Sequence, residues 1–225
     1  MSEVVDLEGG ITRPAGFTAA GVACGIKESG NRDLSLVHSA VPARSAAVFT
    51  ASDLWGAPLV VSRRHLQNGV AQAVVANSGC ANTCTGSPGE DDAVRMAQVA
   101  GSSLGISPYD VIVASTGLIG SRLPMDRIER GIEAAVNDLG EKGHLAAAEG
   151  ILTTDTAVKE AACGFSMGDS EIGVGGMAKG AGMIGPKMSA GARGPGEATM
   201  LAFITTDALV DPGFLQECLG RAVDN

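Results

Sequence analysis

One junction near the C-terminal end constrains this chain more than any other feature. The stretch Gly173–Asp207 begins with glycine-dense sequence around a single lysine, Lys179, and continues through a loose run of Gly, Ala and Pro. At Ala198-Thr199 it changes abruptly into an apolar run, 200–206, that is typical of a strand. A threonine between a flexible loop and a strand stands where a chain can be cut and where a nucleophile can be held.

Composition sets broad limits on the class of protein. A chain of 225 residues forms one large domain, or one domain and the start of another. Aromatic residues are only 3% of the chain, so a core must be built from Val, Ile, Leu, Ala and Met. The 32 glycines indicate many tight turns and close backbone approaches. A net charge of -9 without a basic stripe argues against nucleic acid or an anionic membrane as a partner.

The sequence also predicts a cytoplasmic protein. No apolar run approaches the length needed to span a bilayer, and the N-terminus has acidic residues where a signal peptide would have basic ones. The five cysteines are odd in number and scattered, as expected of free thiols in a reducing cytosol. They are Cys24, Cys80, Cys84, Cys163 and Cys218.

Runs of strands with helices grouped between them predict an α+β layered fold. After a solvated arm over residues 1–16, strands are expected at 19–26, 34–38, 46–50 and 109–114, with apolar runs at 57–62 and 70–76 and a hairpin formed by 158–165 and 171–177. Helices are expected at 87–104, 125–139, 145–151 and after Asp211-Pro212. Ser87, Pro88 and Glu90 predict a capping box at the start of the first helix.

Ordered motifs along almost the whole chain resemble the self-cleaving ornithine acetyltransferase (glutamate N-acetyltransferase) family of arginine biosynthesis. At the junction these are KGAGMIGP from Lys179 and ATMLAFITTDA from Ala198. Earlier segments agree in the same order: 16–27, Ala47–Thr50, AVVANSGCANTCTG from Ala73, STGLIGSRLP from Ser115 and TTDT from Thr153. Their shared order makes the resemblance far more specific than any single motif.

The resemblance implies an α/β/β/α layered sandwich of the ornithine-acetyltransferase/aminopeptidase type. It implies cleavage between Ala198 and Thr199, which divides the chain into an alpha-chain portion, 1–198, and the start of a beta-chain portion, 199–225. A hetero-oligomer of alpha and beta chains is then expected. The substrates would be N2-acetylornithine and glutamate, with no metal or bound cofactor, and some family members also use acetyl-CoA as a co-substrate.

Thr199 is the expected nucleophile. A threonine hydroxyl needs a base to act as a nucleophile. After autocatalytic cleavage the freed α-amine of Thr199, with a reference pKa of about 8, can act as the base for the hydroxyl of the same residue. The hydroxyl would carry the acetyl group between the two substrates in a ping-pong cycle. From composition alone the better interpretation is a β-branched residue that begins a strand, and the motifs reverse that preference.

Thr116 and Gly117 are the expected oxyanion stabilisers. They follow the apolar strand 111–114, and a turn there can aim a hydroxyl and a backbone N–H at one point. The resemblance gives its matching Thr-Gly this role. The alternative is an ordinary turn after a strand.

By resemblance, Thr153 and Lys179 match positions that contact substrate. Thr154 and Asp155, which follow Thr153, would contribute to the same contacts. A lysine held among glycines can bind a carboxylate, although a lysine in a turn is usually solvated. A polar loop after strand 70–76 is expected to support the site rather than to catalyse. It contains Asn77, Ser78, Gly79 and Asn82.

Two other patterns do not predict sites. Cys80 and Cys84 have no histidine nearby in sequence, which argues against a metal pair. The segment 180–185 matches G-x-G-x-x-G, but Pro186 follows its third glycine, where the dinucleotide fingerprint requires a helix.

The chain departs from the family pattern in two places. Nine residues, Ser189–Glu197, separate Met188 from Ala198, where the family runs directly into Ala-Thr. The chain also ends at Asn225, whereas family members continue into a half that adds strands and substrate-binding residues, so an unpaired sheet edge is expected. Two alternatives therefore stay open: an N-terminal-nucleophile aminopeptidase or amidase, and a non-catalytic fragment that serves only in assembly.

Overall fold

The computed structural model describes residues 3–51, 54–180, 188–189 and 200–224. The predicted cleavage site, Ala198-Thr199, lies outside the described residues, as do most of the 180–185 glycine pattern and most of the 189–197 segment. The helices are α1 (Ala57–His65), α2 (Gly86–Leu104), α3 (Met125–Asn137), α4 (His144–Gly150) and α5 (Pro212–Asp224), with short 3-10 turns at Gly10–Thr12, Leu66–Asn68 and Pro108–Asp110.

The strands form two four-stranded sheets and one small ladder. They are β1 (Val5–Leu7), β2 (Phe17–Val22), β3 (Leu34–Arg44), β4 (Phe49–Thr50), β5 (Val70–Cys80), β6 (Val111–Leu118), β7 (Lys159–Met167), β8 (Ser170–Lys179), β9 (Met188–Ser189) and β10 (Leu201–Thr206). The first sheet has the order β1-β7-β8-β10 and is antiparallel throughout. The second has the order β2-β3-β5-β6, in which only β5 and β6 are parallel. Strands β4 and β9 pair with each other.

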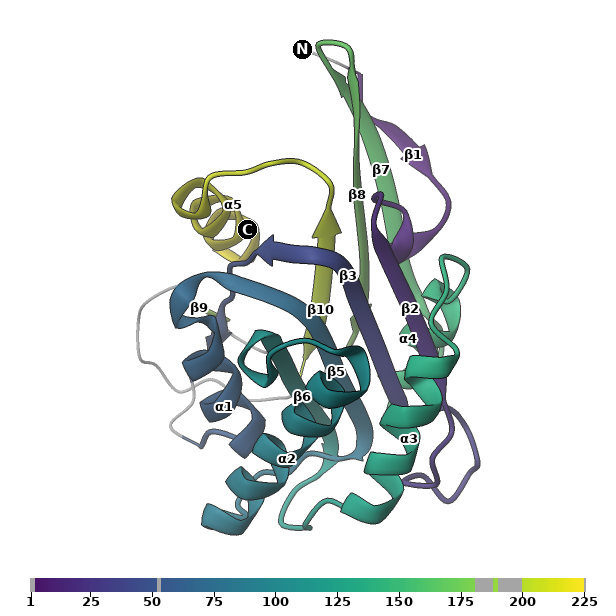
Figure 1. Ribbon diagram of the computed structural model, residues 1–225, viewed down its shortest axis with the longest axis vertical. Coiled ribbons are helices and arrows are strands. Elements are labelled where there is room, and N and C mark those ends of the chain that lie inside the picture. The colour runs from purple at the N-terminus through teal and green to yellow at the C-terminus, as the bar shows by residue number, and fades with distance from the viewer. Residues whose placement is uncertain (1–2, 52–53, 181–187, 190–199, 225) are drawn as a thin grey trace.

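Two apolar clusters hold the layers together. Helices α1, α2 and α3 cover one face of the second sheet, around fully buried residues such as Met96, Ile128 and Ile132. The other face packs against the first sheet through Val37, Met177 and their neighbours. In Figure 1 the tip of the β7–β8 hairpin extends above the β2-β3-β5-β6 sheet, and β10 passes behind β3. The α+β layered fold is confirmed, and the described residues supply the helix, sheet and sheet layers of the expected sandwich.

The N-terminal residues are not a solvated arm. β1 pairs with β7, and the 3-10 turn that follows it is buried, with Ile11 fully inaccessible. Thr205 Oγ1 donates a hydrogen bond to the Ile11 carbonyl at 2.6 Å. No local pattern indicates this, because the few apolar residues of the segment pack against a sheet formed from much later residues.

The apolar run 57–62, placed among the strands of the sequence analysis, lies in helix α1. Its buried residues are Pro58, Val61, Ser62 and His65. These are spaced by three, one and three positions, which is helical periodicity. Pro58 also fits the first turn of a helix, where its missing N–H costs nothing.

Most other predicted elements are confirmed, with different boundaries. Helices α3 and α4, the β7–β8 hairpin, and strands β3, β5, β6 and β10 occur where they are expected. The 46–50 strand is reduced to β4, and Tyr109 belongs to a 3-10 turn. The capping box is wrong, because α2 begins at Gly86 and Ser87 lies inside it. The last helix follows Asp211 as expected, and Asp211 Oδ1 caps it by accepting the backbone N–H groups of Gly213 and Phe214.

The cysteines and the helix lengths agree with the sequence. All five cysteines are free thiols, as expected. Within the described ranges, the helices are too short or too polar to cross a bilayer.

Candidate active site

The end of β6 carries Thr116 and Gly117. The sequence predicts a turn there, and that prediction is wrong, because β6 continues to Leu118. The extension follows from its pairing with β5, where the register shifts at Cys80, which faces both Thr116 and Leu118. An irregularity of this kind keeps two strands paired while bending one of them.

Glycine is required at position 117. Its φ of 131° lies in a region that other residues rarely adopt. A Cβ at this position would lie 2.3 Å from the carbonyl carbon of Gly79, so the two backbones approach too closely for any side chain. Thr116 beside it is 1% exposed. The expected oxyanion pair therefore lies at a crowded strand end rather than in an open turn.

A buried polar layer supports this strand end from β5. Asn77 and Ser78, expected in a loop, instead belong to the strand, which continues to Cys80. Ser115 Oγ donates to Asn77 Oδ1 at 2.6 Å, and Asn77 Nδ2 donates to the Cys80 carbonyl at 2.9 Å. These bonds satisfy side chains that are fully buried or nearly so. The supporting role expected for Asn77 agrees with this geometry.

Asp33 is a supporting residue that the sequence analysis missed. Its carboxylate is fully buried and accepts four successive backbone N–H groups, those of residues 24–27, at 2.7, 3.1, 2.6 and 3.0 Å. This arrangement fixes the 24–27 loop, and Ile26 then lies against Gly79, where a Cβ would meet Ile26 Cγ2 at 2.9 Å. Asp33 thereby braces the same strand end that Gly117 contacts.

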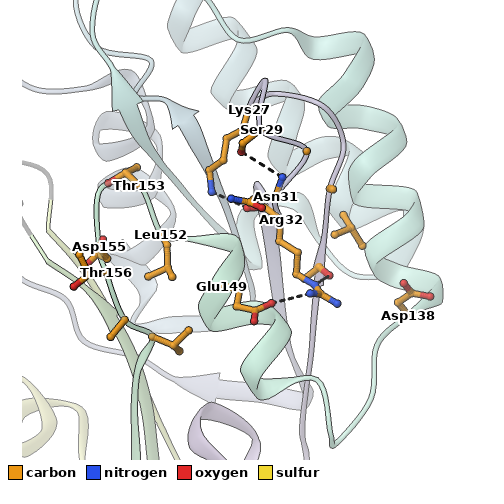
Figure 2. A pocket seen from close by; sticks show the side chains of 16 residues that line it. Lys27, Ser29, Asn31, Arg32, Asp138, Glu149, Leu152, Thr153, Asp155 and Thr156 are labelled. Carbon is orange, nitrogen blue, oxygen red and sulfur yellow. Dashed lines mark hydrogen bonds and ion pairs between the residues drawn. The ribbon is translucent and has the colours of Figure 1, made fainter.

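A cleft of about 830 Å³ opens beside this loop, between residues 27–32 and the segment that joins α4 to β7. Figure 2 shows Thr153, Asp155 and Thr156 on one side of it, and Lys27 and Arg32 toward the other. Arg32 Nη1 forms an ion pair with Glu149 at 2.7 Å. The cleft thus has polar and charged walls of both signs, which suits a small zwitterionic or acidic ligand.

Thr153 lies in the wall of this cleft, as a substrate-contacting residue should. Lys27, which the sequence analysis did not single out, lines it as well. Burial lowers the pKa of Lys27, partly offset by the nearby Asp33 carboxylate. The Lys27 ammonium donates to the Arg32 carbonyl at 2.7 Å, which holds the two sides of the 27–32 loop together.

Lys179 is buried at the end of β8, with 3% of its surface exposed, and is not a solvated turn lysine. Its Nζ donates to the Gly180 carbonyl at 2.7 Å. Asp155 Oδ1 accepts the Gly180 N–H at 2.7 Å and the Lys159 ammonium at 2.6 Å. Burial lowers the pKa of Lys179, and Lys159 lowers it further, against the opposing attraction of Asp155.

The structure links the predicted residues into two connected groups. Asp155 lines the cleft together with Thr153 and accepts the N–H of Gly180, the residue that follows Lys179. Ser78, which pairs with Thr116 in the ladder, donates through its hydroxyl to the Gly150 carbonyl, at 2.6 Å, just ahead of the Thr153 segment. Leu201, the first residue of β10, pairs with Lys179. Thr199, two residues before the start of β10, is outside the described residues.

Comparison with known proteins decides the family. The sequence model of the ArgJ family matches residues 18–225. This chain belongs to the ArgJ family. The arginine biosynthesis bifunctional protein ArgJ of Symbiobacterium thermophilum is 48% identical over 220 residues, which is 97% of this chain and 52% of the relative. The ArgJ of Gloeobacter violaceus is 44% identical over all of this chain and 53% of its own. This chain therefore spans about half the length of the curated relatives it matches.

Solved structures agree with the ArgJ fold. The crystal structure of the arginine biosynthesis bifunctional protein ArgJ from Bacillus halodurans superposes with a TM-score of 0.79 at 40% identity, over 84% of this chain and 100% of that one. Ornithine acetyltransferase from Mycobacterium tuberculosis, solved in complex with ornithine, gives a TM-score of 0.76 at 41% identity, over 83% of this chain and 100% of that one.

Two supporting residues of this ArgJ chain carried only faint sequence signals. Asp33 stands between a polar turn and an apolar strand, a common place for a capping carboxylate. Lys159 follows Asp155 by four positions, but that spacing indicates an ion pair only in a helix, and here the two residues lead into a strand. Both roles depend on which segments the fold brings together.

Proposed function

We propose that this chain is the N-terminal part of a self-cleaving ornithine acetyltransferase, with residues 1–198 as the alpha chain and 199–225 as the start of the beta chain. The observation that carries the proposal is the pairing of Leu201 with the buried Lys179. It puts the start of the strand that follows the Ala198-Thr199 junction beside Lys179, from which the strand then runs away along β8. Family membership over residues 18–225 supports it.

The proposed maturation is an acyl shift followed by hydrolysis. The Thr199 hydroxyl attacks the Ala198 carbonyl, the peptide C–N bond breaks, and an ester and a free α-amine form. Water then cleaves the ester and leaves Ala198 as a carboxylate and Thr199 as a new N-terminus. The two chains remain together as a hetero-oligomer, in the cytoplasm.

The proposed transfer uses the same hydroxyl twice. The Thr199 α-amine accepts the hydroxyl proton while Oγ1 attacks the acetyl carbonyl of N2-acetylornithine, and ornithine leaves with that proton on its amine. The α-amine of glutamate then attacks the acetyl ester, which yields N-acetylglutamate and restores the hydroxyl. Thr116 and Gly117 stabilise the oxyanion in both steps. Thr153 and Lys179 hold the substrate carboxylates, and acetyl-CoA is an additional acetyl donor to be tested.

An intact-mass spectrum of the purified chain tests maturation first. We expect two fragments that separate between Ala198 and Thr199, a single uncut mass for Thr199→Ala, and slower cleavage for the matched Thr199→Ser, which keeps a hydroxyl. One uncut mass for the unmodified chain would withdraw the proposal of self-cleavage for this chain.

Transfer is tested with a protein extended by a C-terminal half such as its relatives have. Acetyl transfer from N2-acetylornithine to glutamate should show parallel lines in double-reciprocal plots and be lost in Thr199→Ala. Hydrolysis of small peptide amides in its place would indicate an aminopeptidase or amidase. If Thr199→Ala changes neither the mass pattern nor turnover, the chain is a non-catalytic assembly partner.

A further inference from the structure

Lys27 enters the cleft from a loop whose backbone is held on two sides. The Lys27 N–H donates to Asp33 Oδ2 at 3.0 Å and is the last of the four backbone N–H groups that this buried carboxylate accepts. On the other side Arg127, from helix α3, donates to the Gly25 carbonyl. Asp33 is itself tied to β5, because its carbonyl accepts the Ser78 N–H at 2.8 Å. The root of the Lys27 side chain is therefore fixed before a ligand arrives, which reduces the entropy lost on binding.

The Lys27 ammonium keeps hydrogen-bond donors for a ligand. A lysine ammonium has three N–H donors, and among the described residues one of them is used, by the Arg32 carbonyl at 2.7 Å. In Figure 2 the side chain extends from the loop on the side of Thr153, and both residues line the same cleft. A carbonyl accepts a hydrogen bond but carries no net charge, so the positive charge of Lys27 is not neutralised by this contact.

Most other charged side chains of the cleft wall are paired, Arg32 with Glu149 at 2.7 Å and Asp155 with Lys159 at 2.6 Å. Figure 2 shows Asp138, the remaining acidic residue of the wall, on the far side of Arg32 from Lys27. Within the part of the chain that the structure describes, Lys27 forms no ion pair. Of the described residues that line the cleft, Lys27 is therefore the cation whose charge is left for a ligand.

Burial makes an anion beside Lys27 favourable. Lys27 is half-buried, and this burial lowers the pKa of its ammonium, although the attraction of the Asp33 carboxylate offsets part of the effect. A charge that has lost part of its water shell gains free energy from an anion in contact with it. Carboxylate is the anionic group that small amino acids carry, and a concave site with a few placed polar groups suits a ligand of that size.

We propose that Lys27 is a further ligand-contacting residue: its ammonium binds the α-carboxylate that N2-acetylornithine and glutamate share, in addition to the contacts proposed for Thr153 and Lys179. The identity of the ligand rests on the proposed function, whereas the preference of the cleft for a carboxylate beside Lys27 does not.

Calorimetric titration of this chain tests the contact with two probes. One is N2-acetylornithine, and the other is N-acetylputrescine, which has the same acetamide and terminal amine but lacks the carboxylate. We expect Lys27→Met to weaken the binding of N2-acetylornithine about tenfold, the effect of losing one charge-assisted hydrogen bond at a partly solvated site, and to leave N-acetylputrescine unchanged. Equal weakening of both probes, no weakening, or an unmodified chain that binds neither probe would overturn the proposal.

Two further variants separate the charge of Lys27 from its contact with the loop. Lys27→Arg keeps a cation and should bind N2-acetylornithine nearly as well as the unmodified chain. Lys27→Gln can still donate to the Arg32 carbonyl but is neutral, so it should bind as weakly as Lys27→Met. If Lys27→Gln restores binding, Lys27 acts only by holding the 27–32 loop, and the proposal fails. Lys142→Met, at an exposed lysine outside the cleft, should change neither affinity.

A second arm uses the extended, acetyl-transferring protein. Lys27→Met should raise the KM for N2-acetylornithine and the KM for glutamate about tenfold each, with little change in kcat, because the contact is made equally in the ground state and the transition state. Unchanged KM values in a protein that transfers the acetyl group would overturn the contact and leave the proposed function standing. Carboxylate-dependent binding at Lys27 without acetyl transfer would keep the contact and withdraw the proposed function.

Discussion

Gly117 combines a positive φ with a close backbone neighbour. Its φ of 131° and the 2.3 Å approach to Gly79 exclude a side chain for two separate reasons. We expect Gly117→Ala to lower the free energy of unfolding by more than about 2 kcal/mol, since strain and overlap add. Urea unfolding followed by circular dichroism measures the change.

Gly120 provides the matched control for that substitution. It also has a positive φ, 85°, but nothing lies within 4 Å of a Cβ built on it. Gly120→Ala should therefore cost only about 1 kcal/mol, the penalty for the backbone conformation alone. Equal losses in the two variants would show that the contact with Gly79 contributes nothing to stability.

The buried Lys179 makes stability depend on pH in the alkaline range. Its pKa is lowered, chiefly by burial, so between that pKa and the ordinary value near 10.5 the unfolded chain binds more protons than the folded one. Stability must then rise with pH across this window. In denaturant titrations at a series of pH values, the unmodified chain should gain stability relative to Lys179→Met as the pH increases. A difference that is constant or falls with pH would contradict the burial of a charged lysine.

At the scale of single residues, the sequence indicates which residues to examine better than it indicates what each of them contacts. Motif resemblance predicts Thr153 and Lys179 as substrate-contacting residues, and in the structure Thr153 lines the cleft while Lys179 is buried at the end of β8. The roles of Asp33 and Lys159 could not be predicted, because each depends on contacts between segments that only the folded chain brings together. The roles of the predicted site residues stay predictions: Thr116, Gly117, Thr153, Lys179 and Thr199.

Among the elements, two helix starts make contrasting predictions. Asp211 accepts two backbone N–H groups at the start of α5, whereas Ser87 lies within α2 and does not cap it. Asp211→Ala should weaken α5 by about 1 kcal/mol, seen as faster amide hydrogen exchange in its first turns. Ser87→Ala should change exchange in α2 by less than about 0.5 kcal/mol. A larger effect of Ser87→Ala on exchange would mean that Ser87 does cap α2, as the sequence predicts.

The elements that the sequence predicted well are those whose pattern is local. Helix α3 buries Ile128, Ile132 and Ala135, which recur in the sequence at helical spacing. Strand ends were predicted poorly, because pairing across the sheet decides them. β6 continues through Thr116 because it stays paired with β5, whose register shifts at Cys80. The local sequence STGLIG has no feature from which this pairing could be predicted.

At the scale of the whole molecule, one sheet has a separate apolar cluster on each of its faces. Ile132 belongs to the cluster under the helices and Ile151 to the one between the sheets, and both are fully buried. Ile132→Ala and Ile151→Ala should each cost about 2–5 kcal/mol. Because the second sheet joins both clusters, we expect one unfolding transition, coincident by Trp55 fluorescence and circular dichroism.

The exposed Ile204 of β10 serves as the control. With 63% of its surface accessible, Ile204→Ala should change stability by less than about 0.5 kcal/mol. Transitions that separate by probe in either core variant would show that the two faces of the sheet unfold as independent units.

The anchoring of β10 has a practical consequence. Six residue pairs join it to β8, Thr206 Oγ1 donates to the Gly173 carbonyl, and Asp207 just beyond it accepts the N–H groups of Ala15 and Gly173. A polypeptide severed ahead of this strand would stay assembled through these bonds, the Thr205 hydrogen bond to Ile11, and the packing of Leu201 and Phe203 against the cluster between the sheets. On a native gel, cut and intact molecules would migrate as one band, and only a denaturing gel would separate them. A synthetic peptide that begins near residue 200 should likewise complement a chain that ends before it, so that the strand behaves as a detachable subunit.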